Sequence, residues 1–436
     1  MLFILWFFYF SFVHIGQRFY SFGWDILLCE VGFMAMFVAP LYQVSNFFKK
    51  SPPHILSIWL FRFLAFRIML GAGLIKLNAQ ESCWTDLTCL EYHYQTQPIP
   101  NPFSWYLHQL PVEFQHFGVL VNHFIELIVP FFLIGPRKIR HFGAICTIIF
   151  QTILIISGNL SFLNWLTITT CLFCFDDNFY TKLLPKTFKE RFSSFLESFK
   201  RSRPIAPSLY TLRNASICTF FFISMILAQH PLKNLLPVKK NMDTFFHDYF
   251  HIDNPTPNIF PNRQMMNASF NKLLIMNTYG AFGTVGKVRH EIIIYGTNED
   301  RITKDTKWME YEFKYKPGSL IRSPPIIAPY QPRLDWQIWF AAMGSYRNYP
   351  WFITFVAKLL ENEPEVIKLI ANNPFTSKAP KFIKADLYLY EFTSWDEDND
   401  DWWRRKKAGA YLPPISLENK SLRDFLKFHG HKVPAY

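Results

Sequence analysis

The sequence predicts a polytopic α-helical membrane domain followed by a β-rich α+β domain on the far side of the membrane. Half of the 436 residues are hydrophobic and 19% are aromatic, whereas only 18% are charged, a composition too apolar for an ordinary soluble protein. Long apolar segments are concentrated in the first half, and shorter alternating segments follow. We therefore expect a membrane domain at 1–231 and a second domain at 240–436.

Seven segments approach the roughly 20 apolar residues that a helix needs to cross the hydrocarbon layer. They are 1–13, 25–43, 56–76, 119–134, 142–157, 160–176 and 214–231. The turn SGNLS separates the segments 142–157 and 160–176, which predicts two short crossing helices. Alternatively, the region 142–176 is re-entrant or forms a single tilted helix.

Basic loops set the predicted topology. The loops 46–54, 135–141 and 182–213 are basic, and the last one carries eight basic residues against two acidic ones, a net charge of +6. The positive-inside rule places all three loops in the cytosol. This requires 142–176 to cross twice, and it places the loop 77–118 and the chain after about residue 231 on the far side. The overall charge of +12 is thus a topology signal, and we expect no nucleic-acid partner.

The far-side loop contains the polar, aromatic stretch ESCWTDLTCLEYHYQTQPIPNP, in which Cys83 and Cys89 lie six positions apart. In an oxidising lumen or exterior these two cysteines are candidates for a disulfide, and two free thiols are the alternative. The other five cysteines lie in or beside apolar segments, where a thiol packs as a small hydrophobic group.

The second domain combines predicted strands and helices. Alternating or apolar runs that end at turn residues predict strands at 288–297, 308–318 and 383–394. Helical periodicity predicts helices at 335–346, 350–361 and 364–373, and the last two begin at a proline. The charged run 396–407 is expected to be a solvated hairpin or loop. Sequons at Asn267 and Asn419 are candidates for glycosylation on the far side.

Ionisable residues inside apolar segments are functional candidates because a charge in lipid is costly. They include Arg62, Arg67, Lys76, His123 and Glu126. His123 and Glu126 share a helical face, and Lys76 lies at a segment end, where its amine can reach the interface. The alternative to a proton-transfer or ligand site is a structural Arg–Glu pairing. Standard hydrolase, metalloprotease and phosphate-binding motifs are absent from the sequence, so we predict no catalytic residue, cofactor or metal.

Several ordered sequence blocks carry a family resemblance. They are RIMLGAGLIKL (67–77), CWTDLTCLEYHYQTQPIPNPFSWYLHQLP (83–111), NHFIELIVPFFL (122–133), SGNLSFLNWLT (157–167), CFDD (174–177), NTYGAFG (277–283), QPRLDW (331–336), WFAA (339–342), NNPF (372–375) and WWRRKKAGAYLPPISL (402–417). Together they span about residues 15–420 and resemble the lipase maturation factor family, more closely its first vertebrate paralogue type.

The resemblance implies a multi-pass membrane protein of the endoplasmic reticulum without a known enzymatic activity. Such proteins assist the folding and assembly of secreted dimeric lipases, notably lipoprotein lipase, and their lumenal C-terminal region engages the client. The family commonly has a cysteine pair at the positions of Tyr315 and Pro325, and this chain lacks both cysteines. A cysteine relay through that pair is therefore excluded here.

Two other function classes compete with a folding factor. A polytopic enzyme that modifies lumenal substrates, similar in its helical core to membrane carboxylases, would act through Lys76, His93, His123 or Glu126. A membrane pocket around a lysine or glutamate with a strongly shifted pKa would favour the enzyme. A transporter would need internal repeats, and the sequence shows none.

Overall fold

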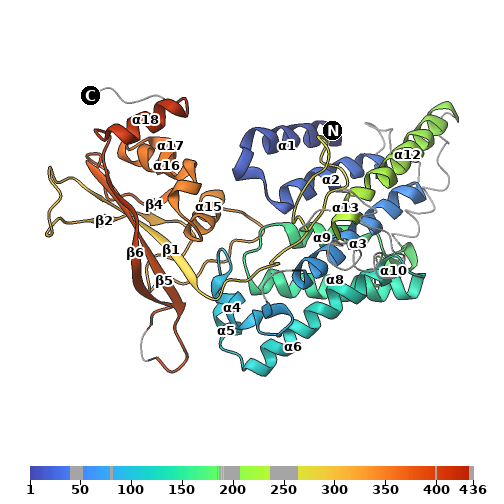
Figure 1. Ribbon diagram of the computed structural model, residues 1–436. Helices are drawn as coiled ribbons and strands as arrows, with labels where there is room; N and C mark the ends of the chain where they lie inside the picture. Colours follow the sequence, from blue (N-terminus) through green and yellow to red (C-terminus); the bar gives the residue numbers. More distant parts are fainter. Residues whose placement is uncertain are drawn as a thin grey trace, which may run out of the picture. The chain divides into compact units, whose positions relative to one another are not determined.

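The computed structural model describes residues 1–39, 53–78, 82–183, 185, 188, 190, 207–235, 264–397 and 400–431. The chain folds into two compact units, each assembled from separate stretches of sequence (Figure 1). The helical unit comprises 1–88, 116–154 and 162–284, and the sheet unit comprises 89–115, 155–161 and 285–436. The predicted basic loops 46–54 and 182–213 lie mostly outside the described residues.

Most helices of the first half belong to the helical unit. They are α1 (Leu2–Gly16), α2 (Gly23–Val38), α3 (Ile55–Leu77), α6 (Val112–His123), the π-helical turn η3 (Phe124–Ile128), α7 (Val129–Leu133), α8 (Arg137–Ser157), α9 (Leu163–Leu172), α10 (Asp177–Leu183), α12 (Pro207–Leu227) and α13 (Gln229–Leu235), with short 3-10 turns at Gln17–Tyr20 and Ser82–Trp84. Apolar residues on every side of α3 make it the central helix, because such a helix is stable only when it is surrounded. Its residues Leu60, Phe61 and Leu64 pack with Leu27 and Met34 of α2.

Five helical stretches among the described residues are long and apolar enough to span a membrane. They are Leu2–Tyr20, Ile55–Leu77, Val112–Leu133, Arg137–Ser157 and Thr211–Leu235. Two predicted segments correspond to shorter helices, since α2 has 16 residues and α9 has 10. At 1.5 Å per residue α9 extends about 15 Å, roughly half of the hydrocarbon thickness. The chain is thus a multi-pass membrane protein, and the count of seven crossings stays a prediction.

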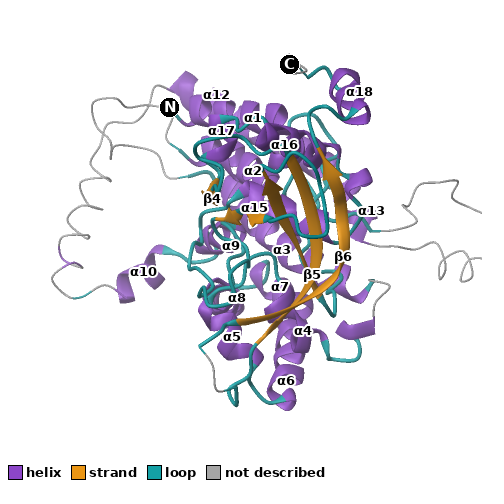
Figure 2. Cartoon of the chain, turned by 90° about the vertical axis from the view of Figure 1, so that its left-hand side faces the viewer, coloured by secondary structure: helices purple, strands orange, loops and turns teal. Residues whose placement is uncertain are grey.

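The sheet unit is built on one antiparallel sheet of order β2-β1-β5-β6, in which β5 and β6 lie side by side (Figure 2). Its strands are β1 (Arg289–Thr297), β2 (Met309–Glu310), β5 (Phe382–Phe392) and β6 (Trp403–Ile415), and a second small sheet pairs β3 (Glu312–Phe313) with β4 (Ile370–Asn372). The accompanying helices are α4 (Cys89–Thr96), α5 (Pro102–His108), α15 (Arg333–Ala342), α16 (Pro350–Leu360), α17 (Pro364–Ile367) and α18 (Lys420–Phe428), with a 3-10 turn at Tyr346–Asn348.

Both faces of the central strand β1 are covered. Ile292 and Ile294 belong to a core that includes Ile338 of α15 and Phe352 of α16. Ile293 points to the opposite face, where it packs in a second cluster that includes Trp403. A strand that is buried on both faces has a continuous apolar sequence, and the run IIIY (292–295) shows this pattern. The membrane helices followed by this α+β unit confirm the predicted fold class.

One local prediction in the second half was wrong. The predicted helix 364–373 ends after Ile367, and the chain then forms β4, because Ile370 pairs with Phe313 of β3. The run 396–407 lies in the β5–β6 hairpin, one of the two alternatives predicted for it, and β6 begins at Trp403 and pairs with β5. Because β6 begins with several charged residues, it lacks the apolar alternation that would have predicted a strand. Such charges are typical of an edge strand.

Gly71 of α3 provides a test of the packing between this helix and residue 279. A Cβ added at Gly71 would lie 2.4 Å from the carbonyl oxygen of Tyr279, whereas one added at Gly409 of β6 would meet nothing within 4 Å. We expect Gly71→Ala to lower the free energy of unfolding by about 1–3 kcal/mol, and Gly409→Ala to change it by less than about 1 kcal/mol. Thermal unfolding of the full chain in lipid nanodiscs measures both, and equal Tm values for the two variants would contradict the packing.

Candidate functional site

Lys76 and Glu126 form a buried ion pair in the helical unit. The Lys76 Nζ lies 2.6 Å from both carboxylate oxygens of Glu126 and 3.0 Å from Oδ1 of Asn122. Asn122 Nδ2 in turn donates to Glu126 Oε2 at 3.0 Å. The amine therefore does not reach outward to the membrane interface, because its charge is neutralised inside the unit.

Trp84 and His123 lie on the other side of this pair. The Lys76 Nζ is 4.6 Å from the centroid of the Trp84 ring, a cation–π distance. Trp84 Nε1 donates to the carbonyl oxygen of Phe282 at 2.8 Å, and His123 Nε2 lies 2.9 Å from the carbonyl oxygen of Trp84. The structure thus places His123 against the Trp84 backbone, although the helical spacing puts it on the same face as Glu126.

The backbone around Glu126 is a π-helical turn, Phe124–Ile128. Such turns are rare and occur where a helix must accommodate an extra residue, often at functional positions. Here the turn packs closely on α3, because a Cβ at Gly73 would lie 2.9 Å from the Glu126 carbonyl oxygen. The glycine and the π turn together let the carboxylate approach Lys76.

A second buried pair joins Arg67 of α3 to Glu30 of α2. Arg67 Nη1 also donates to the carbonyl oxygen of Asn277 at 2.7 Å. The second oxygen of Glu30 accepts hydrogen bonds from Asn277 N at 3.1 Å and from the Tyr279 hydroxyl at 2.7 Å. Glu30 was missed by sequence reasoning, although an acid inside the predicted segment 25–43 was a sufficient signal.

Arg62 has a separate role. Its Nε donates to the carbonyl oxygen of Phe173 at 2.9 Å, and its guanidinium lies 5.5 Å from the centroid of the Trp59 ring. Phe173 is the C-cap residue of α9, where the helix dipole is negative and favours a cation. Of the five predicted intramembrane residues, the structure therefore brings Lys76, His123 and Glu126 into one neighbourhood and leaves Arg62 and Arg67 elsewhere in the unit.

The sheet unit contains a buried charged network that sequence reasoning did not find. Glu291 of β1 accepts from Arg289 at 2.6 Å and lies 2.9 Å from Lys316 Nζ, and all three side chains are at most 1% exposed. Asp335 lies on α15, and its Oδ1 accepts from the backbone N–H groups of Tyr315 and Lys316, both at 2.9 Å. Two cations and two carboxylates thus compensate each other.

Arg289 also binds the polar loop between the membrane segments. Its Nη1 donates to the carbonyl oxygens of Gln95, at 2.9 Å, and Gln97, and its Nη2 donates to that of Pro98 at 2.9 Å. Only a guanidinium offers enough N–H donors in one plane for this set of acceptors. The polar, proline-studded stretch that follows Cys89 is therefore part of the sheet unit.

Cys83 and Cys89 are both disulfide-bonded, and the cysteines at 29, 146, 171, 174 and 218 are free thiols. Of the two sequon asparagines, Asn419 is exposed and caps α18, where its Oδ1 accepts from Ser421 N and Leu422 N. Asn267 is half-buried, and its Oδ1 accepts from Gly280 N at 3.3 Å.

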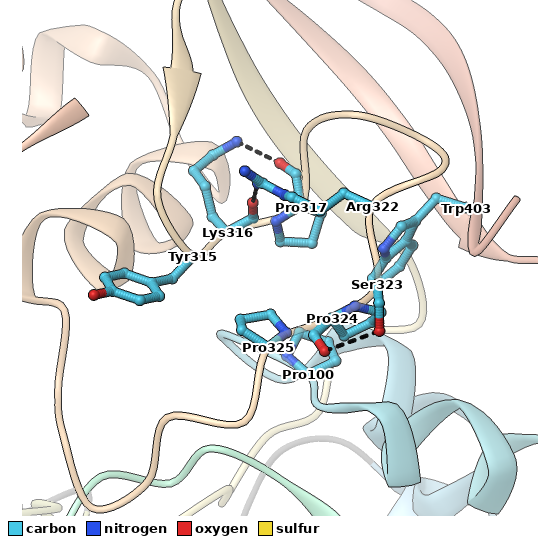
Figure 3. A pocket seen from close by; sticks show the side chains of 9 residues that line it. All are labelled: Pro100, Tyr315, Lys316, Pro317, Arg322, Ser323, Pro324, Pro325 and Trp403. Atoms are coloured by element: carbon cyan, nitrogen blue, oxygen red, sulfur yellow. Dashed lines mark hydrogen bonds between the residues drawn. The ribbon is translucent and has the colours of Figure 1, made fainter. Parts of the chain in front are cut away.

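A small hollow in the sheet unit is lined by Pro100, Tyr315, Lys316, Pro317, Arg322, Ser323, Pro324, Pro325 and Trp403 (Figure 3). Its cavity volume of about 10 Å³ is far below the roughly 300–1,000 Å³ of small-molecule sites. Tyr315 and Pro325 both line it. Among the described residues, no group of three or more histidine, cysteine or acidic side chains could hold a metal ion.

Two family models match the chain. One is described as the lipase maturation factor transmembrane domain and matches residues 1–182, and the other, the lipase maturation factor C-terminal domain, matches 275–413. The chain is 40% identical to lipase maturation factor 1 of Homo sapiens, over 99% of this chain and 73% of that protein. The identity to lipase maturation factor 1 of Mus musculus is 41%, over 99% and 72%. Lipase maturation factor 2 of Xenopus tropicalis is 31% identical, over 98% and 70%. No solved structure matches the chain.

The pairing of Lys76 with Glu126 can be tested by neutralising one or both residues. K76M leaves a buried carboxylate without its cation, so we expect it to lower the free energy of unfolding by about 3–5 kcal/mol. K76M/E126Q has no buried charge at this position and should recover most of that loss. K138M, at the exposed Lys138 of α8, is the matched control, with an expected change within about 0.5 kcal/mol. Thermal unfolding in nanodiscs would contradict the pairing if K76M and K138M were equally stable.

Asp335 predicts a pH dependence of the sheet unit. Burial raises its pKa above the ordinary value of 3.8, and the backbone N–H groups of Lys316 and Tyr315 oppose this only in part. A raised folded-state pKa contributes stability that is fully present below the unfolded pKa and is lost as the pH rises through the folded pKa. We therefore expect D335N to flatten the fall in Tm as the pH rises from about 4 towards neutral.

Asp300 is the control for this experiment. It is exposed, and its hydrogen bond and ion pair with Lys381 lower its pKa. Because the contribution of such a group is lost as the pH falls, D300N should change the pH profile in the opposite direction. A D335N profile that parallels wild type over this range would show that Asp335 does not carry the pH dependence.

Proposed function

This chain belongs to the lipase maturation factor family, and from that premise we propose that it assists the folding and dimer assembly of secreted lipases such as lipoprotein lipase. It would do so in the endoplasmic reticulum membrane, with the part of the predicted domain 240–436 that belongs to the sheet unit in the lumen. The match to lipase maturation factor 1 proteins over nearly the whole chain is the observation that carries the proposal.

The make-up of the sheet unit supports the proposed topology. The stretches 89–115, 155–161 and 285–436 fold together, and a bilayer does not allow parts of one compact unit to lie on opposite sides. Asn159 illustrates this, because its Nδ2 donates to the carbonyl oxygen of Pro325 at 2.7 Å and its Oδ1 accepts from Ile327 N at 2.9 Å. The two loops and the C-terminal region then share one compartment, which agrees with the predicted cytosolic position of the basic loops.

Features of that shared compartment fit the lumen. The disulfide-bonded Cys83 and Cys89 require an oxidising environment. Asn419 is exposed, and its capping hydrogen bonds use Oδ1, whereas a glycan attaches to Nδ2. We propose Asn419 and Asn267 as the glycosylation sites of this face.

The proposed mechanism is reversible binding of a partly folded client. The sheet unit exposes large apolar side chains, which include Ile321, Ile326, Tyr330 and Met343. Surfaces of this kind bind apolar groups that a client has not yet buried, and the client leaves when it buries them itself. This mechanism uses no cofactor and no covalent step.

An enzyme remains the second candidate, with Lys76, His93, His123 and Glu126 as its residues. The geometry favours the folding factor, because the Lys76 amine is fully engaged by Glu126, Asn122 and the Trp84 ring. His93 is buried in α4 of the sheet unit, whereas the other three belong to the helical unit. A general base needs a free face toward a substrate, and these contacts give Lys76 a structural role.

Secretion of an active lipase tests the proposal. In a host without its own maturation factor, co-expression of this chain with a secreted dimeric lipase should raise the secreted lipase activity, and the lipase should co-precipitate with the chain. K76M/E126Q, normalised for abundance, should retain both effects, because it removes the charges but keeps the packing. A stable double variant that binds the lipase without rescuing it would favour the enzyme, and neither rescue nor binding by wild type would overturn the folding role.

A further inference from the structure

An aromatic cluster forms where α5 meets the loop between β5 and β6. The Trp105 ring lies 4.7 Å from Trp395 and 5.7 Å from Trp402, both in edge-to-face geometry, and Tyr106 lies 5.5 Å from Trp395. Such geometries are favourable between aromatic rings. We call Trp105, Tyr106, Trp395 and Trp402 the aromatic surface of the sheet unit.

Hydrogen bonds fix the two segments against each other. Trp105 Nε1 donates to Thr393 Oγ1 at 3.2 Å, and Gln109 Nε2 donates to the Thr393 carbonyl oxygen at 2.9 Å. Thr393 Oγ1 in turn donates to the carbonyl oxygen of Asp401 at 2.7 Å, which closes the loop. The aromatic surface is therefore held in place by residues nearly 300 positions apart in sequence.

Part of this surface faces outward. Trp395 is 61% exposed and Tyr106 is 46% exposed, and the neighbouring Phe103 of α5 is 48% exposed. Exposed large aromatic side chains that gather in one place mark a contact surface rather than scattered surface residues. Within the described part of the sheet unit, the exposed parts of these aromatic side chains are not covered by other residues.

The chain on one side of the surface leads directly into the membrane. α5 ends at His108, the candidate membrane-spanning helix Val112–Leu133 begins four positions later, and its continuous apolar part begins at about residue 119. Four residues reach at most about 14 Å, and the first two turns of the helix add about 10 Å. The aromatic surface is thus tethered within about 25 Å of the hydrocarbon, near the zone where tryptophan and tyrosine are enriched in membrane proteins.

We propose that the aromatic surface lies in the bilayer interface and holds the β5–β6 loop against the lipid headgroups. The indole and phenol groups provide the apolar body and polar edge that this zone accommodates. The same loop carries Asp396, Glu397, Asp400 and Asp401, which disfavour an anionic surface. The lipid partner is therefore a zwitterionic headgroup, such as phosphatidylcholine.

Lipid quenching tests this contact in the full chain. A fluorescent amino acid replaces Trp395, and the protein is placed in phosphatidylcholine nanodiscs with or without a lipid that carries a nitroxide on its headgroup. The control carries the same label at Phe428, which is 86% exposed and belongs to α18. This helix lies at the end of β6 opposite the β5–β6 loop (Figure 1). The 13 residues of β6 separate the two ends by about 40 Å.

We expect a roughly twofold or greater loss of emission at position 395 and little loss at position 428, because headgroup nitroxides reach little beyond the interface. Phosphatidylserine in place of part of the phosphatidylcholine should reduce the loss. A label at Tyr106, which leaves Trp395 intact, should repeat the result and guard against a local distortion.

Equal loss of emission at 395 and 428 would overturn the proposal. So would a label at 395 whose emission changes only when lipase is added, because that is the behaviour of a client-binding surface. The inference requires only that Val112–Leu133 spans the bilayer, so its failure leaves the lipase proposal unaffected.

Discussion

A charge in an apolar interior needs an opposite charge beside it, and this requirement joins the distant segments of each unit. Glu30 holds Arg67, so α2 is fixed to α3. Glu126 holds Lys76, so α3 is fixed to the π turn. In the sheet unit Glu291 holds Arg289, whose remaining N–H groups reach the loop at 95–98. Breaking one such pair is costly because the remaining charge stays buried.

The helix α3 carries the two buried ion pairs described above, and the segment NTYGAFG (277–283) lies along this helix from one pair to the other. Asn277 contacts the first pair, and the carbonyl oxygen of Phe282 binds Trp84, which covers the second. The small residues Gly280 and Gly283 of this segment lie against Ile75. Packing thus explains Asn277 and the two glycines of the block 277–283, because each of them contacts α3.

Features that depend on neighbouring residues could be predicted from the sequence, whereas contacts between residues far apart in the chain could not. Membrane helices such as Ile55–Leu77 and the buried strand at 289–297 were predictable, because lipid and a two-sided core each impose a local pattern. Lys76 and Glu126 were recognisable as unusual, but their pairing joins residues 50 positions apart, which no periodicity reports. The Arg289 network was not predictable for the same reason, since Arg289 and Glu291 in isolation read as solvated strand residues.

The discontinuous sheet unit has a consequence for the order of synthesis. The hydrogen-bond partner of Asn159, Pro325, lies 166 positions further along the chain. A ribosome that adds 5–20 residues per second reaches it only after roughly 10–30 s. During that interval the loops at 89–115 and 155–161 are translated without the strands that bury them. Asn159 also begins the sequon Asn-Leu-Ser, so a glycan added in this window would occupy the amide that later binds Pro325. A protein that we propose to protect partly folded clients is thus itself partly folded during synthesis. Its sheet unit becomes complete only when the C-terminal strands have been made.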